Sequence, residues 1–311
     1  MDASTSTNSL DQALSAVEDG ERRAADDSAG AGRGALPNLV VIGAQKCGTS
    51  GLHYQLSLHP EIWMSRPKEL NFFIEERNWF RGQDWYRNCF DARAKVRGES
   101  SPNYTAYPQH RGVPKRMHSV VPDAKLVYVV RDPLERIAAH WVHNYAKRRE
   151  KGDLTATLTH ANASYVARSK YHMQLQRFLA HYPFEQVLVL EQEELRSAPV
   201  QTLRRVFEFT GVDPDFSHPH FGAQRHETSR KTRASRLAMR LERLSGTRQG
   251  RVVPKNLWLA IDEKLGRRRP MERPDVRAAV GPQVLHVLRE DAERLRELTG
   301  RQLASWSIWD A

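Results

Sequence analysis

The stretch Asn38-Leu-Val-Val-Ile-Gly43-Ala-Gln-Lys46-Cys-Gly48-Thr49-Ser50 decides how the rest of this sequence is interpreted. It opens with a short apolar run rich in β-branched side chains, which is typical of a strand buried on both faces of a parallel sheet. Gly43 to Thr49 is expected to be a loop, and Ser50–His59 a helix that ends before Pro60. Backbone amides at such a helix start are unpaired and lie at the positive end of the helix dipole, so this arrangement favours an anion.

Further apolar runs alternate with helical stretches along the chain. Lys125–Val130 and Gln186–Leu190 are expected to be buried strands, followed by helices over residues 133–149 and 200–209, and Val96–Glu99 is a weaker strand candidate. This alternation predicts an α/β fold: a P-loop-like, doubly wound parallel sheet flanked by helices, in a single domain. Ligands of such folds bind at the carboxyl ends of the strands.

The two ends of the chain differ in composition. Residues 1–35 hold seven acidic residues against three arginines and almost nothing to bury, which predicts a disordered N-terminal tail before a domain over residues 36–311. Asp275 to Thr299 has apolar residues at helical spacing and is expected to be one amphipathic helix that ends near Gly300. Residues 222–273 are dense in Arg and Lys, and we expect loops and exposed helices there.

Composition excludes several classes of protein. The two cysteines, Cys47 and Cys89, are too few for a disulfide framework or a metal cluster, so no metal is expected. There is no apolar run long enough to span a membrane and no secretory signal pattern, which predicts a cytoplasmic protein. The formal net charge of +11 indicates an anionic ligand, although charge alone does not choose between nucleic acid, acidic lipid and a polyanionic cofactor or substrate.

The order of residues in the first loop separates two kinds of nucleotide site. The loop of nucleoside triphosphatases, G-x-x-x-x-G-K-[ST], places its Lys after the second Gly and a Ser or Thr on magnesium. Here Lys46 precedes Gly48, and Thr49 takes the position of that lysine, so the magnesium-dependent order is broken. The pattern K-x-G-T-[ST]-x-L instead resembles the loop of sulfotransferases that use 3′-phosphoadenosine-5′-phosphosulfate (PAPS). The resemblance implies that PAPS, with its product PAP, is bound by Gly43, Lys46, Cys47, Gly48, Thr49 and Ser50.

A second motif, His59-Pro60 followed by Lys68-Glu69-x-x-Phe72-Phe73, is similar to the heparan-type and bacterial branch of that family. In that branch the Glu is the catalytic base, so the resemblance implies this role for Glu69, with Lys46 as a catalytic cation. Aromatic neighbours would partly desolvate Glu69 and make it a better proton acceptor. From spacing alone, the alternative is an ordinary ion pair of Glu69 with Lys68 or Arg66. The resemblance also implies acceptor contacts for Lys68, Phe72 and Phe73.

Histidines are rival bases, because another branch of sulfotransferases uses His. None of the four candidates lies in the sequence context of that branch, and we expect them to be mainly structural or surface residues. The four are His53, His59, His140 and His143.

The segment Gly98-Glu99-Ser100-Ser101-Pro102-Asn103-Tyr104 resembles the family pattern G-E-x-[ST]-P-x-Y at the floor of the acceptor cleft, which implies acceptor contacts for Ser100 and Tyr104. Animal heparan enzymes often carry Lys at the position of Ser100, so this departure removes any argument for a heparan-like acceptor. A hydroxylated small molecule, a lipid and a glycan stay open as acceptors. No nucleic-acid partner and no integral membrane segment are expected, and the oligomeric state is open.

Arg131-x-Pro133-x-x-Arg136-x-x-Ala139 resembles the family's motif for the 3′-phosphate, which implies that Arg131 binds this group. Arg136 is expected to pair with acids or to support the loop. The phosphate-binding Ser of the family falls on Ala139, a loss on the order of 1–3 kcal/mol unless His140 or the late basic segment replaces it.

Two more segments carry looser matches. Lys231 and Arg233 lie where many relatives have a basic loop over the 3′-phosphate, with a solvated loop as the alternative. Tyr171 lies in a pattern, Ser169-x-Tyr171, that often occurs near the nucleotide.

These motifs together predict an O-sulfotransferase. Glu69 would take the proton of an acceptor hydroxyl, which attacks sulfur in line, while the Lys46 loop stabilises the leaving phosphate without a metal. Two alternatives stay open. A nucleoside or sugar kinase would require magnesium, and a non-catalytic polyanion-binding protein would tolerate Glu69→Gln.

Overall fold

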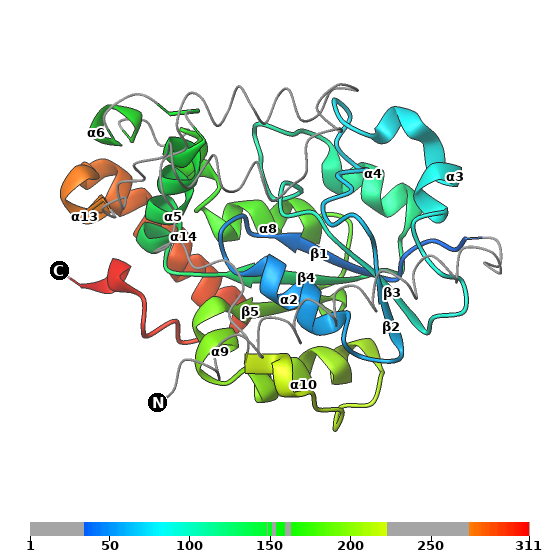
Figure 1. Ribbon diagram of the computed structural model, residues 1–311. Coiled ribbons are helices and arrows are strands. Elements are labelled where there is room, and N and C mark those ends of the chain that lie inside the picture. The colour runs from blue at the N-terminus through cyan, green and yellow to red at the C-terminus, as the bar shows by residue number, and fades with distance from the viewer. Residues whose placement is uncertain (1–33, 148, 151–153, 159–162, 223–273, 311) are drawn as a thin grey trace, which may run out of the picture.

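The computed structural model describes residues 34–147, 149–150, 154–158, 163–222 and 274–310. Its centre is one parallel sheet of five strands in the order β2-β3-β1-β4-β5 (Figure 1). The strands are β1 Leu39–Gly43, β2 Ile62–Met64, β3 Val96–Ser100, β4 Lys125–Val130 and β5 Val187–Glu191. This confirms the predicted α/β fold and its four expected strands. Strand β2 was not predicted, because a strand of three residues is too short to show a period.

The direction of the crossovers decides which face each helix covers. The chain moves from β1 to β2 towards one edge, and from β3 through β4 to β5 towards the other. Right-handed connections therefore place their helices on opposite faces of the sheet. Helix α2 (Thr49–Leu56) and α10 (Pro199–Thr210) lie on one face, and α4 (Val113–Val120) and α8 (Tyr171–Leu179) on the other (Figure 1). The C-terminal helix α14 (Pro282–Thr299) packs on α8.

The C-terminal region differs from the single helix that the spacing predicts. It consists of α13 (Val276–Ala279) and α14, separated by extended backbone at Val280 and Gly281. Pro282 explains the break, because it has no amide hydrogen to donate to the preceding turn and it favours the start of a helix. The predicted end is confirmed, since Gly300 follows α14 with a φ of 66°.

The remaining elements are short, apart from the helix after β4, which ends a turn earlier than predicted. The helices are α3 Gly82–Arg87, α5 Pro133–Ala146, α6 Leu154–Thr157, α7 Ser164–Ala167 and α9 Gln192–Ser197. Four 3₁₀ turns are η2 Trp79–Arg81, η3 Phe184–Gln186, η4 Pro219–Gly222 and η7 Ser307–Trp309.

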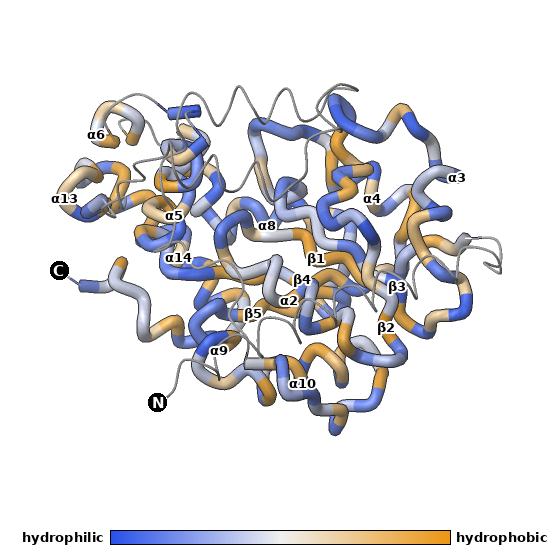
Figure 2. The backbone as a smooth tube through the Cα atoms, viewed as in Figure 1, coloured by the Kyte–Doolittle hydropathy of each residue, from blue (hydrophilic) through white to orange (hydrophobic). Residues whose placement is uncertain are grey.

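The core lies along the central strands. All five residues of β1 are buried, and so are the last five of β4, so these strands have apolar neighbours on both faces. Figure 2 shows the same pattern as an apolar centre with more hydrophilic segments outside it. The predicted N-terminal tail and the late basic segment with Lys231 and Arg233 lie outside the described residues, apart from Gly34 and Ala35. Of the helices that the structure describes, none is long and apolar enough to cross a bilayer.

Candidate active site

The predicted anion-binding loop begins at the carboxyl end of β1, the middle strand of the sheet. A Cβ atom at Gly43 would lie 2.0 Å from Oγ1 of Thr105, so glycine lets the end of β1 approach the segment after β3. Lys46 and Gly48 have left-handed backbone, with φ values of 75° and 89°. These two left-handed residues turn the chain from β1 into α2. No side chain of the described residues caps the N-terminus of α2. The first amides of α2 are therefore available to an anion.

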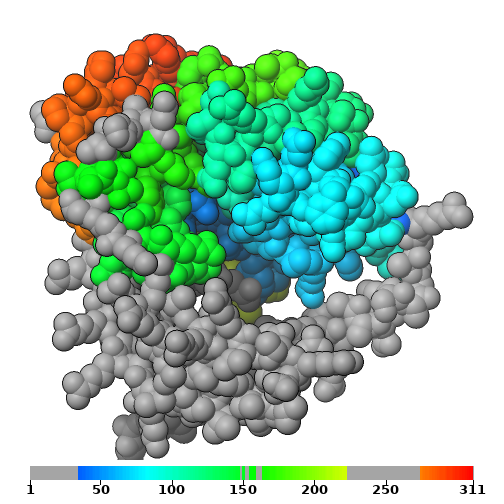
Figure 3. Space-filling view, turned by 90° about the horizontal axis from the view of Figure 1, so that it is seen from above, coloured from blue at the N-terminus to red at the C-terminus, as the bar shows by residue number. Residues whose placement is uncertain are grey.

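A cavity of about 590 Å³ lies above this loop. Its lining includes residues that directly follow four strands: the loop after β1, Pro102 and Asn103 after β3, Arg131 after β4 and Gln192 after β5. These residues therefore meet at the carboxyl ends of the strands, where ligands of such folds bind. Seen from above, blue atoms of the N-terminal part of the domain lie in a hollow between green and cyan regions (Figure 3).

The lining of this cavity is strongly basic. Glu69 contributes the carboxylate among the described lining residues, against six Lys and Arg side chains: Lys46, Arg77, Arg131, Lys147, Arg149 and Arg168. A concave surface with this balance of charge attracts and holds anions. No group of three His, Cys, Asp or Glu side chains that could hold a metal ion occurs in the described part of the chain.

Arg131 is fixed beside the loop. It is 8% exposed, its Nη1 donates to the backbone oxygen of Lys46 at 3.5 Å, and its Nη2 donates to Glu135 at 2.8 Å. Glu135 lies one turn along α5, so the ion pair holds the guanidinium at the start of that helix. Arg131 therefore lies close to the loop and lines the same cavity, as a donor-binding role requires.

Arg136 is fully buried beneath the cavity, and the expectation that it pairs with acids is wrong. Its donors go to Ser169 Oγ, to the backbone oxygen of Tyr165 and to His140 Nδ1, and no carboxylate of the described residues bonds to it. Since a guanidinium can only donate, Nδ1 of His140 accepts this bond. Burial, followed by the charges of Arg136 and Arg168, holds the pKa of His140 well below its usual range. The neutral ring therefore carries its proton on Nε2 and can donate a hydrogen bond but cannot act as a base.

Glu69 reaches the cavity from left-handed backbone with a φ of 68°. Its side chain is 43% exposed, and its carboxylate lies 2.9 Å from the Lys68 ammonium. The expectation that aromatic rings desolvate Glu69 is wrong, because Phe72 and Phe73 are both fully buried in the core. Phe72 stacks on Tyr86 with ring centres 4.2 Å apart. Neither phenylalanine is accessible to an acceptor. The observed ion pair of Glu69 with Lys68 is the alternative that sequence spacing alone indicates.

Comparison with known proteins assigns the chain to a family. The model of the sulfotransferase domain matches residues 36–250. The chain belongs to the sulfotransferase domain family. The chain is similar to a crystal structure of a sulfotransferase from Alicyclobacillus acidocaldarius, with a TM-score of 0.61 and 27% sequence identity. The match covers 88% of this chain and 99% of the other chain.

Curated relatives carry the same domain within longer chains. Human bifunctional heparan sulfate N-deacetylase/N-sulfotransferase 2 is 29% identical over 58% of this chain and 22% of its own length. Mouse heparan sulfate glucosamine 3-O-sulfotransferase 3B1 is 31% identical over 62% of this chain and 50% of its own length. The chain thus spans between a fifth and a half of these relatives.

Ser100 and Tyr104, predicted to contact the acceptor, lie beneath the cavity of this sulfotransferase-family domain rather than in its lining. Ser100 is fully buried, with its Oγ 2.9 Å from Nδ1 of His53. Tyr104 is 2% exposed and donates to the buried carboxylate of Glu99, as do Tyr86 and Ser101. The hydroxyl groups of both predicted residues are thus bonded within the protein, and neither residue lines the cavity.

Two of the rival histidine bases also have structural contacts. Burial, with a smaller effect of Lys68, lowers the pKa of His53 to about 4. His59 is 2% exposed, lies between the rings of Phe207 and Phe216, and contacts the backbone oxygen of Asp213. These contacts confirm the expectation of structural roles for both residues.

Cys47 and Tyr171 support the loop from below. Both are buried, and the Tyr171 hydroxyl lies 3.6 Å from the Cys47 sulfur. Burial raises the pKa of the Cys47 thiol to about 11, so it stays protonated. The side chain of Tyr171 does not line the cavity; it packs between the loop and Trp306. A direct contact of Tyr171 with the nucleotide therefore does not fit this structure.

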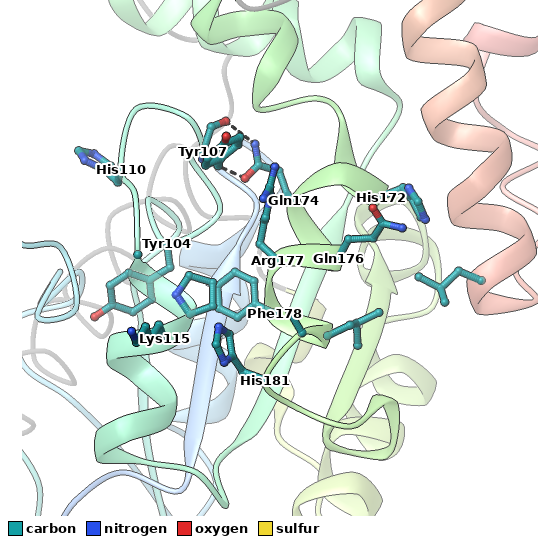
Figure 4. A pocket seen from close by; sticks show the side chains of 15 residues that line it. Tyr104, Tyr107, His110, Lys115, His172, Gln174, Gln176, Arg177, Phe178 and His181 are labelled. Atoms are coloured by element: carbon teal, nitrogen blue, oxygen red, sulfur yellow. Dashed lines mark hydrogen bonds between the residues drawn. The ribbon is translucent and has the colours of Figure 1, made fainter.

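A second hollow of about 700 Å³ lies between α4 and α8, away from the anion-binding loop (Figure 4). The backbone of Tyr107 is joined there to the side chain of Gln174 by two hydrogen bonds. The segment after β3 separates the two spaces, since Asn103 and Gln109 line the first while Tyr107 and His110 line the second. None of the loop residues reaches this hollow.

Sequence motifs did not identify four of the cations that line the cavity above the anion-binding loop, which we call the active cavity. Arg77, Lys147, Arg149 and Arg168 come from segments without a motif. Among the four, Arg168 directly precedes the pattern Ser169-x-Tyr171, which is a sequence signal for its position near the site.

Proposed function

We propose that the chain transfers a sulfuryl group from PAPS to a hydroxyl group of an acceptor. The observation that carries the proposal is the basic cavity above the loop Lys46-x-Gly48-Thr49 at the carboxyl edge of the sheet. Membership of the sulfotransferase domain family and the similarity to a bacterial sulfotransferase structure support it.

PAPS carries anionic groups at two positions, and the cavity offers cations for both. Lys46, the amides of Gly48 to Ser50 and the hydroxyl of Thr49 would hold the 5′-phosphosulfate. Arg131, 3.5 Å from the backbone of Lys46, would hold the 3′-phosphate. Ala139 offers no hydroxyl, so the donor's affinity depends more on these charges than on neutral hydrogen bonds.

Transfer would then proceed by in-line displacement. Glu69 takes the proton of the acceptor hydroxyl, and the hydroxyl oxygen forms a bond to sulfur. The bond between sulfur and the bridging oxygen of the 5′-phosphate breaks, and PAP leaves with the electron pair. Lys46 and the loop amides stabilise the charge that grows on the phosphate. Among the residues in reach, His140 is excluded as the base because its free ring nitrogen carries the proton.

The relatives named above act on heparan sulfate, one on nitrogen and one on oxygen. We infer a hydroxyl acceptor for this chain, on a glycan, a lipid or a small molecule, because a carboxylate base suits removal of a hydroxyl proton.

The donor assignment is tested by calorimetric titration of the wild type with PAP and with AMP. We expect PAP to bind at least tenfold more tightly; equal affinities would contradict a PAPS site. Turnover is followed as PAP release from PAPS in the presence of a metabolite and glycan mixture. Glu69→Gln is expected to keep PAP affinity and lose turnover, whereas Glu75→Gln, at a 70% exposed carboxylate, keeps both. A strict magnesium requirement would favour a kinase instead.

A further inference from the structure

Arg168, directly after α7, is a buried cation without a carboxylate partner. It is 6% exposed and lines the active cavity. Its Nη1 donates to the amide oxygens of Gln45 and Asn103 at 3.1 and 3.0 Å, and its Nη2 donates to that of Gln109 at 2.6 Å. All three partners are neutral. No carboxylate from the part of the chain that the structure describes bonds to Arg168, and its Nε is buried without a hydrogen-bond partner.

The charge of Arg168 is costly where it lies. Burial, followed by the repulsion of Arg136 and Arg77, lowers the pKa of its guanidinium to about 10, which still leaves it charged at neutral pH. Buried charges in proteins are normally paired with a counter-ion. Here the amide oxygens fix the guanidinium in place and leave its charge uncompensated. An anion that enters the cavity would supply the missing counter-ion.

The position of Arg168 indicates which anion this is. On one side it holds Gln45, the residue before Lys46 of the donor loop. On the other side it holds Asn103, whose amide donates to Asn71 Oδ1 at 3.2 Å. The Asn71 amide in turn donates to the backbone oxygen of Glu69 at 2.7 Å. Arg168 is thus joined through amide side chains to the donor loop and to the backbone of the proposed base. Gln45, Asn103 and Glu69 line the same cavity as Arg168, and this cavity must also admit the acceptor.

We propose that Arg168 binds an oxyanion of the acceptor, a carboxylate or a sulfate close to the hydroxyl that is modified. This inference rests on the proposed function and makes the acceptor an anionic molecule. The guanidinium supplies a full positive charge, and its fixed orientation reduces the entropy lost on binding. Arg77 lines the same cavity and adds positive charge.

The test uses inorganic sulfate as the probe and protein saturated with PAPS, so that the donor fills its own anion sites. We expect the wild type to bind sulfate, seen by titration calorimetry and as a rise in melting temperature at constant ionic strength. Arg168→Gln should lose this response and keep its affinity for PAP within threefold. Arg177→Gln is the matched control, because Arg177 lines the second hollow and stacks over Tyr107. Arg168→Lys keeps the charge and should therefore keep part of the response to sulfate. This variant still tests the proposal if Arg168→Gln is unstable.

A second arm measures specificity in the turnover assay. Matched acceptors with a free carboxylate and with its methyl ester are compared, and the free acid should have at least a tenfold higher kcat/KM. Arg168→Gln should remove that difference. Absence of sulfate binding to the PAPS-loaded wild type, or a large loss of PAP affinity in Arg168→Gln, would overturn the inference. Failure of the proposed function is a different result, namely a wild type that does not bind PAP.

Discussion

Replacing Gly43 by Ala should damage both the stability of the fold and the site, because the end of β1 has no room for a side chain. A Cβ atom at Gly43 would lie 2.0 Å from Thr105 Oγ1 and 3.0 Å from Tyr128 Cε2. Both neighbours are buried, so one of them has to move by more than an ångström. Overpacking of this kind costs about 1–3 kcal/mol. The Thr105 hydroxyl, whose single hydrogen lies within reach of the backbone oxygens of Ile42 and Pro102, also gives up a bond of about 0.5–1.5 kcal/mol.

The expected loss for Gly43→Ala is therefore about 3 kcal/mol in the free energy of unfolding, measured by urea denaturation. PAP affinity should fall as well, because Thr105 lies in the segment that brings Asn103 into the cavity. Gly51→Ala is the matched control for stability: its Cβ would meet nothing within 4 Å, and alanine within a helix should add roughly 0.5–1 kcal/mol. Thr105→Ala should partly rescue the Gly43→Ala variant. The reasoning fails if Gly43→Ala and the wild type have the same midpoint of urea denaturation.

Three further predictions concern residues around the site. Phe72→Ala should cost about 3–5 kcal/mol of stability because the ring is fully buried, whereas Phe80→Ala, at an 80% exposed ring, should stay within about 0.5 kcal/mol; equal effects in urea denaturation would show that Phe72 is not a core residue. Tyr104→Phe removes one of three hydroxyl groups bonded to Glu99 and should lower stability by roughly 1–3 kcal/mol; an unchanged melting temperature would contradict that bond. Burial raises the pKa of Asp291 from 3.8 to about 6, so its contribution favours the folded state most below 3.8 and declines as the pH rises towards 6. Asp291→Asn should remove this pH dependence, which amounts to up to about 3 kcal/mol in the free energy of unfolding. Parallel profiles of that free energy against pH in wild type and variant would refute the prediction.

Much of the fold could be predicted because the central strands of a parallel sheet are buried on both faces. Such burial requires continuous apolar runs, and β1, β4 and β5 show them in the sequence. The loop could be predicted for a similar reason, since left-handed backbone at Gly48 and close contact at Gly43 both favour glycine. These are local requirements, which leave local signatures.

The errors concern residues whose role depends on the path of distant segments. An aromatic pair such as Phe72 and Phe73 suits a cleft and a core equally well, and contacts with Tyr86 decide for the core. Apart from its place before Ser169, nothing in the sequence distinguishes Arg168 among 48 basic residues, because its burial depends on Gln45, Asn103 and Gln109 from other parts of the chain. Periodicity predicts which side chains share one face of a helix or strand, but it does not predict which residues pack against that face.

Charged side chains lie at two depths around the loop that contains Lys46. Lys46 and Arg131 line the cavity, while Arg136 lies beneath it with its donors bonded to Ser169, Tyr165 and His140. Neutral groups thus hold Arg136, and no carboxylate of the described residues bonds to it. A hydroxyl at position 139 would add one neutral hydrogen bond, which is worth less than a charged one. The cavity therefore offers the proposed polyanionic donor the charges of Lys46 and Arg131 although position 139 is alanine.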